Sequence, residues 1–268
     1  MREITQSDHI ERISRVIAQI RSEPERTLSL NDIADIVALS PFHAIRVFRL
    51  ITGYTPAAMQ TALRIQEAKR LLAVERMSVT DACFTVGFSS LGSFSQRFSS
   101  LTAVNPSEYR TARDRADDLA EELARLERTP LGPAPESHSV SGRLVGQESP
   151  TCFYFVGLFP PGPPQGRPIR GDVLNGPGEF VIRHVPDGTY VIYSAAIATP
   201  RHAVEWVMPD TELLTGGGQT VQMCCGMPVD SVEIELRARS VLVTPLLTTL
   251  MAIPNLAADA RLNHWVRQ

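Results

Sequence analysis

Hydrophobic residues in the first part of the chain recur three and four positions apart, which is the spacing of an amphipathic helix. In the segment His9–Ser22, isoleucine or valine occupies positions 10, 13, 16, 17 and 20, so one face is predicted to be buried. Serine or proline at helix starts and glycine after helix ends divide the rest of this part into shorter helices. The further predicted helices are Asn31–Ala38, Pro41–Thr52, Pro56–Glu75, Val79–Val86, Leu91–Leu101 and a long helix from Pro106 through Arg128.

Beyond residue 139 the pattern changes to short runs rich in β-branched and aromatic residues, separated by glycine and proline. The predicted strands are Val140–Val145, Cys152–Phe159, Glu179–Val185, Thr189–Ala198, Thr220–Cys225, Ser231–Ala238 and Leu246–Ile253. The tripeptides at 186–188 (Pro-Asp-Gly) and 216–218 (Gly-Gly-Gly) are predicted turns. About seven short strands with frequent breakers are typical of an antiparallel β-sandwich.

The helical part repeats itself at an offset of 50 residues. Four residues recur at that offset, as the pairs Ser40/Ser90, Phe48/Phe98, Thr52/Thr102 and Pro56/Pro106. Each copy is a short helix, a tight turn and a second helix, which is the helix-turn-helix plan; its second helix enters the major groove of DNA. The helix that links the copies is predicted to span roughly 30 Å. Successive major grooves lie ~34 Å apart, so the two recognition helices are expected in adjacent grooves.

Specific residues of the repeat and its flanks occur in a fixed order. They are the runs Ala68-Lys69-Arg70-Leu71-Leu72, Ser78-Val79-Thr80-Asp81 and Val86-Gly87-Phe88, then Phe94, Phe98, and Asn105-Pro106-Ser107-Glu108-Tyr109-Arg110. In order and spacing they resemble the signature of the AraC/XylS family of transcription regulators, over about residues 9–112. The resemblance implies a seven-helix domain that binds double-stranded promoter DNA, with RNA polymerase as a further partner. The family has glycine where this chain has Ala103, so the turn there is expected to differ locally.

In the first recognition helix, the outward residues near the N-terminus are the expected DNA contacts. They are Phe42, His43, Ile45, Arg46 and Arg49. Arg46 is the best candidate for a base contact, because its fork of donors matches guanine O6 and N7; a phosphate contact or a surface ion pair is the alternative. Phe42 is expected to touch thymine methyl groups or sugars, or else to close the domain core. Val47, Phe48 and Leu50 are expected to point inward.

The second recognition helix has weaker candidates for base contacts. They are Leu91, Gly92, Ser93, Ser95, Gln96 and Arg97. Serine and glutamine bond phosphates or adenine, whereas Leu91 and Gly92 offer no fork of donors. The expectation is that the second copy positions the protein on DNA and the first copy specifies the sequence.

Charge and proline content define the expected domains. The 268-residue chain has a formal net charge of −3, but residues 1–115 carry +3 and residues 116–268 carry −6. The basic half coincides with the helical repeat, which weakly suggests nucleic-acid binding; on charge alone, chance is the preferred explanation. Three prolines within residues 129–139 predict a semi-rigid linker. The expected architecture is an all-α double helix-turn-helix domain over 1–128, followed by an all-β antiparallel sandwich over 140–268.

Parts of the second half resemble a transthyretin-like or carboxypeptidase-regulatory-like sandwich. The resemblance rests on Val140-Ser141-Gly142-Arg143-Leu144, Val156-Gly157-Leu158-Phe159, Gly178-Glu179-Phe180 and Val185-Pro186-Asp187-Gly188-Thr189-Tyr190. It implies a fold and no particular chemistry. Two roles stay open: a sensor of a small-molecule effector, or a homodimerisation or protein-binding module without a ligand. The residues expected to fill a ligand pocket are Tyr154, Tyr190, Tyr193 and Trp206 or Trp265.

No constellation of side chains in the sequence indicates catalysis, so a non-enzyme without metal or cofactor is expected. Its histidines lack metal-ligand spacing, and neither a Gly-x-Ser-x-Gly element nor a phosphate loop occurs. Cys83 is expected in the core. Cys224 and Cys225 lie in a predicted strand, where neighbouring side chains point to opposite faces; joint metal binding is therefore not expected, and a vicinal disulfide sensor is the alternative.

The remaining features bear on localisation. No apolar run reaches the ~18 residues of a membrane span. The N-terminal residues contain no apolar signal segment, and the cysteine spacing indicates no disulfide framework. A cytoplasmic protein without a membrane partner is the expectation.

Overall fold

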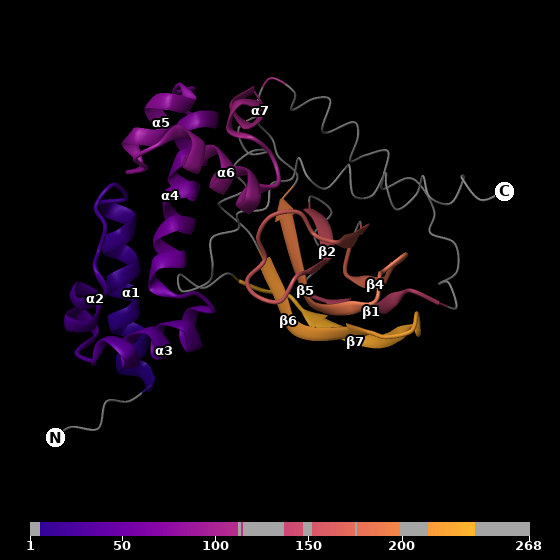
Figure 1. The fold of residues 1–268 in the computed structure, drawn as a ribbon. Helices are drawn as coiled ribbons and strands as arrows, with labels where there is room; N and C mark the ends of the chain where they lie inside the picture. The colour runs from indigo at the N-terminus through magenta and orange to yellow at the C-terminus, as the bar shows by residue number, and fades with distance from the viewer. Residues whose placement is uncertain are drawn as a thin grey trace.

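The computed structural model describes residues 6–111, 114, 137–146, 152–174, 176–198 and 214–238. Seven helices come first along the chain, and strands follow in two sheets (Figure 1). The helices are α1 (Gln6–Ser22), α2 (Leu30–Val37), α3 (Pro41–Thr52), α4 (Pro56–Ala73), α5 (Val79–Thr85), α6 (Leu91–Thr102) and α7 (Pro106–Thr111). The strands are β1 (Val140–Val145), β2 (Cys152–Phe159), β3 (Arg170–Leu174), β4 (Gly178–Ile182), β5 (Gly188–Ala198), β6 (Leu214–Met223), β7 (Val229–Glu235) and β8 (Arg237–Ala238).

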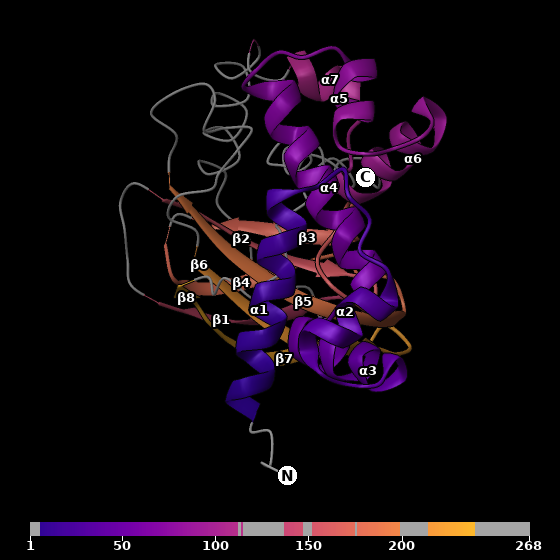
Figure 2. The same cartoon turned by 90° about the vertical axis from the view of Figure 1, so that its left-hand side faces the viewer.

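Helix α4 is the long central element of the helical domain. Helices α2 and α3 lie at one end of it and α5, α6 and α7 at the other, while α1 runs alongside (Figure 2). Proline at its first position and the Thr55 side chain, which accepts a hydrogen bond from the Ala58 N–H, define its start. With 18 residues, it spans about 27 Å. The two helix-turn-helix copies are therefore held apart by one continuous helix.

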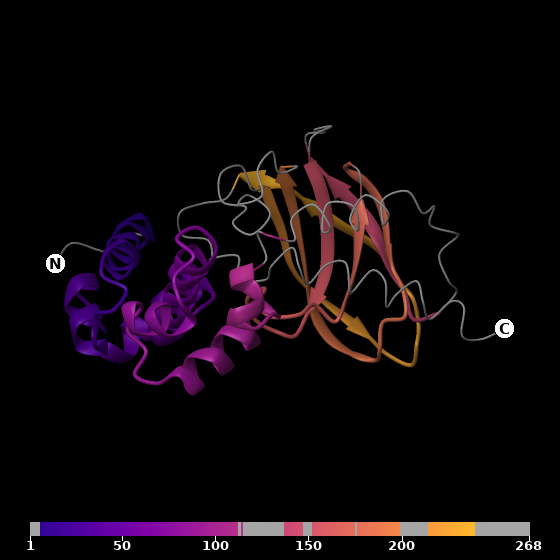
Figure 3. The same cartoon turned by 90° about the horizontal axis from the view of Figure 1, so that it is seen from above.

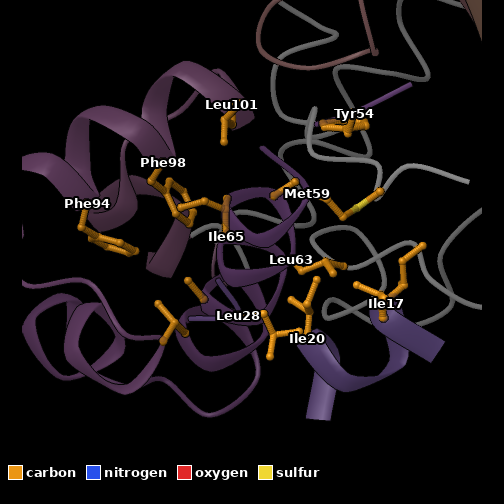
Figure 4. Packing of buried hydrophobic residues seen from close by; sticks show 14 of the residues in the cluster. Ile17, Ile20, Leu28, Tyr54, Met59, Leu63, Ile65, Phe94, Phe98 and Leu101 are labelled. Carbon is orange, nitrogen blue, oxygen red and sulfur yellow. The ribbon is translucent and has the colours of Figure 1, made fainter. Parts of the chain in front are cut away.

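One hydrophobic core extends through the whole helical domain (Figure 4). Ile17 and Ile20 of α1 pack against Leu63 of α4 at one end, and Phe94 and Phe98 of α6 point toward α4 at the other. These positions follow the three-and-four spacing of the sequence, because only that spacing keeps apolar side chains on one helix face.

Polar side chains of α4 attach the loop between α1 and α2 to this core. The buried Gln60 amide accepts a bond from the Leu28 N–H and donates one to the Leu28 carbonyl, both 2.9 Å long. Arg64 donates to the Pro24 carbonyl oxygen. On the other side of the loop lies Gly87, where a Cβ would come within 2.7 Å of the Glu25 backbone. The loop that leads into α2 of the first copy therefore also contacts the turn between α5 and α6 of the second copy.

The strands form a three-stranded sheet of order β4-β1-β7 and a five-stranded sheet of order β3-β2-β5-β6-β8. Phe180 and Ile234 of the first sheet belong to the same buried cluster as Val156 and Ile192 of the second. Nonpolar residues of both sheets therefore share one core.

Four predictions for this region are wrong in detail. The pairing is not antiparallel throughout. After β6 the chain crosses to the three-stranded sheet, where β7 pairs with β1 in parallel. The glycines at 216–218 do not form a turn: they lie inside β6, at a register shift opposite Ile192 and Tyr193. Strand β3 is absent from the predicted strands, and Cys224 and Cys225 follow β6 instead of ending a strand. Strand pairing between distant segments, which local sequence does not encode, explains these differences.

The two domains touch through the loop between β2 and β3. The Gly166 N–H donates a 2.7 Å hydrogen bond to the carbonyl oxygen of Leu101, in the last turn of α6. Figures 1 and 3 show α6 on the side of the helical domain that faces the strands. Most of the expected long helix after Pro106, most of the expected linker and the expected strand 246–253 lie outside the described residues. Among the helices that are described, none has the length and apolar character needed to cross a bilayer.

Candidate nucleic-acid interface

The two helix-turn-helix copies begin with similar caps. At α2, the Ser29 side chain accepts from the Asp32 N–H, and the Asp32 carboxylate accepts in return from the Ser29 N–H at 2.8 Å. At α5, the Ser78 hydroxyl accepts from the Asp81 N–H at 3.0 Å. Both first helices are therefore fixed at their N-termini by a serine and an aspartate three residues later.

Both recognition helices end in the same hydrogen-bonded arrangement. The Thr52 hydroxyl donates to the Phe48 carbonyl at 2.8 Å and accepts from the Tyr54 N–H. The Thr102 hydroxyl makes the equivalent bonds to the Phe98 carbonyl and the Val104 N–H. This agreement in atomic detail confirms the repeat that the sequence predicts.

The residue after each recognition helix adopts a left-handed conformation. Gly53 has φ +76° and Ala103 has φ +70°, and each N–H bonds to the carbonyl four residues earlier. The expectation of a different turn at Ala103 is therefore wrong. Ala103 adopts the same left-handed turn as Gly53, although its Cβ makes this conformation unfavourable by about 1–2 kcal/mol.

On α3 the outward residues are those expected, with one addition. Arg46 and Arg49 are exposed, Phe42 has an exposed fraction of 87%, and His43 and Ile45 are half-buried. The His43 ring lies 6.4 Å from that of His9 on α1. The expectation that Leu50 points inward is wrong, since it is 84% exposed. Val47 and Phe48 are buried as expected.

The outward position of Leu50 has a simple geometric reason. It follows Phe48 by two positions, which on an α-helix is a rotation of about 200°. It therefore lies on the side of α3 away from the core, together with Phe42 and Arg46, which precede it by eight and four positions. The four-residue spacing of Phe42, Arg46 and Leu50 is the sequence signal that identifies this face.

On α6 the outward residues are smaller. Leu91, Gly92, Ser93, Gln96 and Arg97 are exposed, and Ser95 is half-buried. The Ser90 hydroxyl accepts from the Ser93 N–H. The surface of α6 thus offers hydroxyl and amide groups and a single cation.

The charged groups of the helical domain divide into two kinds. Lys69, the lone lysine of the chain, is buried with its Nζ 5.7 Å from the centre of the Tyr109 ring. Many arginines are held by protein groups, as Arg70 is by Glu67 and Glu75. By contrast, the guanidinium groups of the three recognition-helix arginines form no hydrogen bond or ion pair with the residues that the structure describes. These are Arg46, Arg49 and Arg97, and all three are exposed.

The expected ligand residues of the β domain lie in different settings. Tyr154 is fully buried in the core cluster. The Tyr190 hydroxyl donates to the Pro186 carbonyl at 2.9 Å, and the Tyr193 hydroxyl donates to the Gly162 carbonyl at 3.0 Å. Burial raises the pKa of Tyr193. Trp206 lies outside the described residues.

The four cysteines differ in exposure, with Cys152 half-buried. Cys83 is fully buried in the helical core as expected, and burial raises the pKa of its thiol. Cys224 and Cys225 are both exposed, and their Sγ atoms are 3.7 Å apart. The expectation that these two side chains point to opposite faces of a strand is therefore wrong.

Comparisons with known proteins agree with this geometry. A family model described as a helix-turn-helix domain matches residues 33–112. The transcriptional activator AarP of Providencia stuartii is 33% identical over 107 residues, which are 40% of this chain and 79% of AarP. The melibiose operon regulatory protein of Escherichia coli K12 is 29% identical over 98 residues, which are 37% of this chain and 32% of that protein.

The solved DNA-binding domain of AdpA, in complex with a target DNA, is 26% identical, with a TM-score of 0.37. The match covers 39% of this chain and 94% of that one. The repeat and the matched relatives define a DNA-binding transcription regulator of the helix-turn-helix class. Within that class, the chain belongs to the AraC family.

Proposed function

We propose that this protein binds promoter DNA sequence-specifically, with α3 and α6 in two successive major grooves, and acts on RNA polymerase. The observation that carries the proposal is the pair of equivalent recognition helices on one continuous helix, α4. Its length of about 27 Å is comparable with the groove separation of ~34 Å, so one rigid helix can hold the two recognition helices one groove apart.

The two helices have different tasks in this proposal. Helix α3 specifies the sequence, because Arg46 and Arg49 are exposed and uncommitted to described protein groups, and an arginine fork discriminates guanine by about 1–3 kcal/mol. Helix α6 positions the protein, because Ser93, Gln96 and Arg97 are suited to phosphates and sugars.

Selection from a random DNA library with the full chain tests this proposal. Guanine N7 methylation interference on the selected DNA is expected to reveal two major-groove patches about one helical turn apart. The patch with the stronger base preference is expected to be lost in the Arg46→Ala variant. A single patch in the parent chain contradicts the two-groove proposal. Two patches that both persist in the variant contradict the assignment of sequence reading to Arg46.

We further propose that the β domain is a transthyretin-like sandwich that modulates DNA binding. The Gly166–Leu101 hydrogen bond supports this role, because it connects the β2–β3 loop to the end of α6. Gly166 has φ +69°, and a Cβ there would lie 2.5 Å from the Ser100 carbonyl oxygen. A shift of the loop is thus transmitted directly to the backbone of the second recognition helix.

The signal for this modulation is proposed to be a small molecule bound on the Tyr193 face of the five-stranded sheet, because Tyr154 and Tyr190 belong to the buried core on the other face. Thermal shift of the full chain against a metabolite library is expected to show a saturable rise in midpoint. A concentration-dependent dimer in sedimentation experiments, without any ligand response, would instead identify the domain as a dimerisation module. The variant Gly166→Val tests the contact between the β2–β3 loop and α6. It is expected to retain ligand binding but to lose the effect of the ligand on DNA affinity.

A further inference from the structure

The turn between β6 and β7 holds two adjacent thiols on the surface of the β domain. Cys224 and Cys225 are both exposed, with Sγ atoms 3.7 Å apart. The Met227 N–H donates to the Cys224 carbonyl at 3.0 Å, and Cys225 and Gly226 have φ +54° and +67°. Two successive left-handed residues form a tight turn of the type I′ class. The thiols are thus brought together by the backbone.

Groups outside the turn hold this backbone in place. The Asp187 carboxylate accepts from the Cys225 N–H at 3.1 Å and from the Gly226 N–H at 2.9 Å. The Gly226 carbonyl accepts from the His138 N–H at 2.7 Å. Cys225 therefore keeps a conformation that is unfavourable for a side chain with a Cβ, and the two sulfur atoms need no rearrangement to contact one bound atom.

The geometry favours a bridging atom over a direct disulfide. The Cα atoms of neighbouring residues are 3.80 Å apart across a trans peptide, whereas disulfides usually join Cα atoms about 4.4–6.8 Å apart. A bond between Cys224 and Cys225 would therefore be strained. An atom that bonds to both sulfurs avoids that strain, and soft sulfur ligands select soft, thiophilic elements.

We propose that Cys224 and Cys225 form a chelating site for a thiophilic trivalent metalloid, such as arsenic in an organic arsenical. With phenylarsine oxide, two As–S bonds form and the arsenic–oxygen bonding is lost. The oxygen leaves as water with the two thiol protons, and arsenic stays trivalent. The step requires no oxidant or reductant.

The site is placed to affect the DNA-binding domain. His138 is bound to the turn through Gly226, and it lies within the stretch that leads from the helical domain to β1. The register of the five-stranded sheet pairs Gly188 with Met223 and Phe159 with Val191. The thiol turn after Met223 and the loop after Phe159, which contacts α6, therefore lie at the same end of the sheet. Occupation of the site is proposed to change DNA affinity through these connections.

Intact-protein mass spectrometry of the reduced full chain with phenylarsine oxide tests the site. One adduct per chain is expected, which excess 2-mercaptoethanol does not remove but 1,3-propanedithiol does, because only a dithiol competes with a chelate. Cys224→Ser and Cys225→Ser are each expected to lose the resistance to 2-mercaptoethanol. The matched control Cys152→Ser, which removes a half-buried single thiol, is expected to keep it.

Three outcomes would overturn the proposal. A resistant adduct that survives in either single variant places the arsenic elsewhere. If the parent chain forms no adduct but loses the mass of two hydrogen atoms on exposure to oxidised glutathione, the two cysteines form a vicinal disulfide instead. If the adduct forms but DNA affinity changes by less than about fivefold, the lower end of typical coupling between sites, the link to DNA binding is wrong.

Discussion

The two helix-turn-helix copies share their interiors and differ on their surfaces. Phe48 and Phe98 are both fully buried, and the Thr52 and Thr102 hydroxyls make the same bonds. On the outside, Arg46 stands where the other copy has Gln96. Packing and buried hydrogen bonds tolerate few substitutions, whereas exposed positions can change at little cost to the fold. The comparison teaches that one scaffold carries two different contact surfaces.

A second difference lies in the core. The second copy contains a chain of aromatic rings in which successive centroids are 5.3, 5.7 and 5.5 Å apart. Its members are Phe88, Phe94, Phe98 and Tyr109. For the first copy, no such chain occurs among the described residues, although Phe48 is fully buried in the same core. The copies are therefore alike in plan but unequal in packing.

The largest expected effect is on stability and comes from truncating the equivalent phenylalanines. Phe48→Ala and Phe98→Ala are each expected to lower the free energy of unfolding by about 3–5 kcal/mol. Phe98→Ala is expected to lose a further ~0.5–1.5 kcal/mol for each of the two ring contacts that it breaks. Denaturant unfolding followed by the helical circular dichroism signal measures both. Equal losses of unfolding free energy would show that the aromatic chain adds no stability. If the alanine variants do not fold, Phe48→Leu and Phe98→Leu are compared in the same way.

Next in size is the effect on DNA binding at the equivalent surface positions. Arg46→Ala is expected to cost about 1–3 kcal/mol of binding free energy and to relax base preference at one position. Gln96→Ala is expected to cost less, since a neutral hydrogen bond contributes about 0.5–1.5 kcal/mol. Fluorescence anisotropy on selected DNA, with single base changes, gives both values. A larger loss for Gln96→Ala would reverse the proposed division between the copies.

The turns after the recognition helices give a pair of opposite effects. Ala103→Gly is expected to stabilise the protein by about 1 kcal/mol, because it removes a Cβ from a left-handed residue at φ +70°. This gain is reduced by the greater chain entropy of glycine when unfolded. Gly53→Ala is expected to destabilise it by a similar amount, since a Cβ at Gly53 would meet no atom within 4 Å and only the conformation is strained. Thermal unfolding of both variants measures these effects. Shifts of the unfolding midpoint in the same direction would contradict the prediction.

The sequence predicted the helical domain well because its signals are local. Caps such as Ser78 and terminators such as Gly53 act within one turn of the helix they limit, and the repeat identified both recognition helices. The predictions that failed depended on distant partners. Gly217 and Gly218 look like a turn, yet they sit in β6 because β5 pairs with that segment through a register shift. The thiols of Cys224 and Cys225 meet in a tight turn that Asp187, far away in sequence, helps to hold in place.

The smallest expected effect concerns the caps of the two first helices and their dependence on pH. Hydrogen bonds from Ser29 lower the pKa of Asp32 from 3.8. A carboxylate with a lowered pKa stabilises the folded state above its unfolded pKa and loses this contribution as pH falls through the folded value. Asp32→Asn is therefore expected to reduce stability at neutral pH, with a difference from the parent that shrinks below pH 3.8.

Asp81→Asn is the matched variant in the second copy. The Asp81 carboxylate accepts from the Ser78 hydroxyl at 2.6 Å, whereas Asp32 accepts from a backbone N–H. A hydroxyl rotates to water when its acceptor is lost, but the Ser29 N–H has a fixed direction and loses a charged acceptor. Asp32→Asn is thus expected to have the greater effect in unfolding experiments at neutral pH. An equal or smaller effect would mean that the reciprocal cap on α2 adds no stability beyond the single cap on α5.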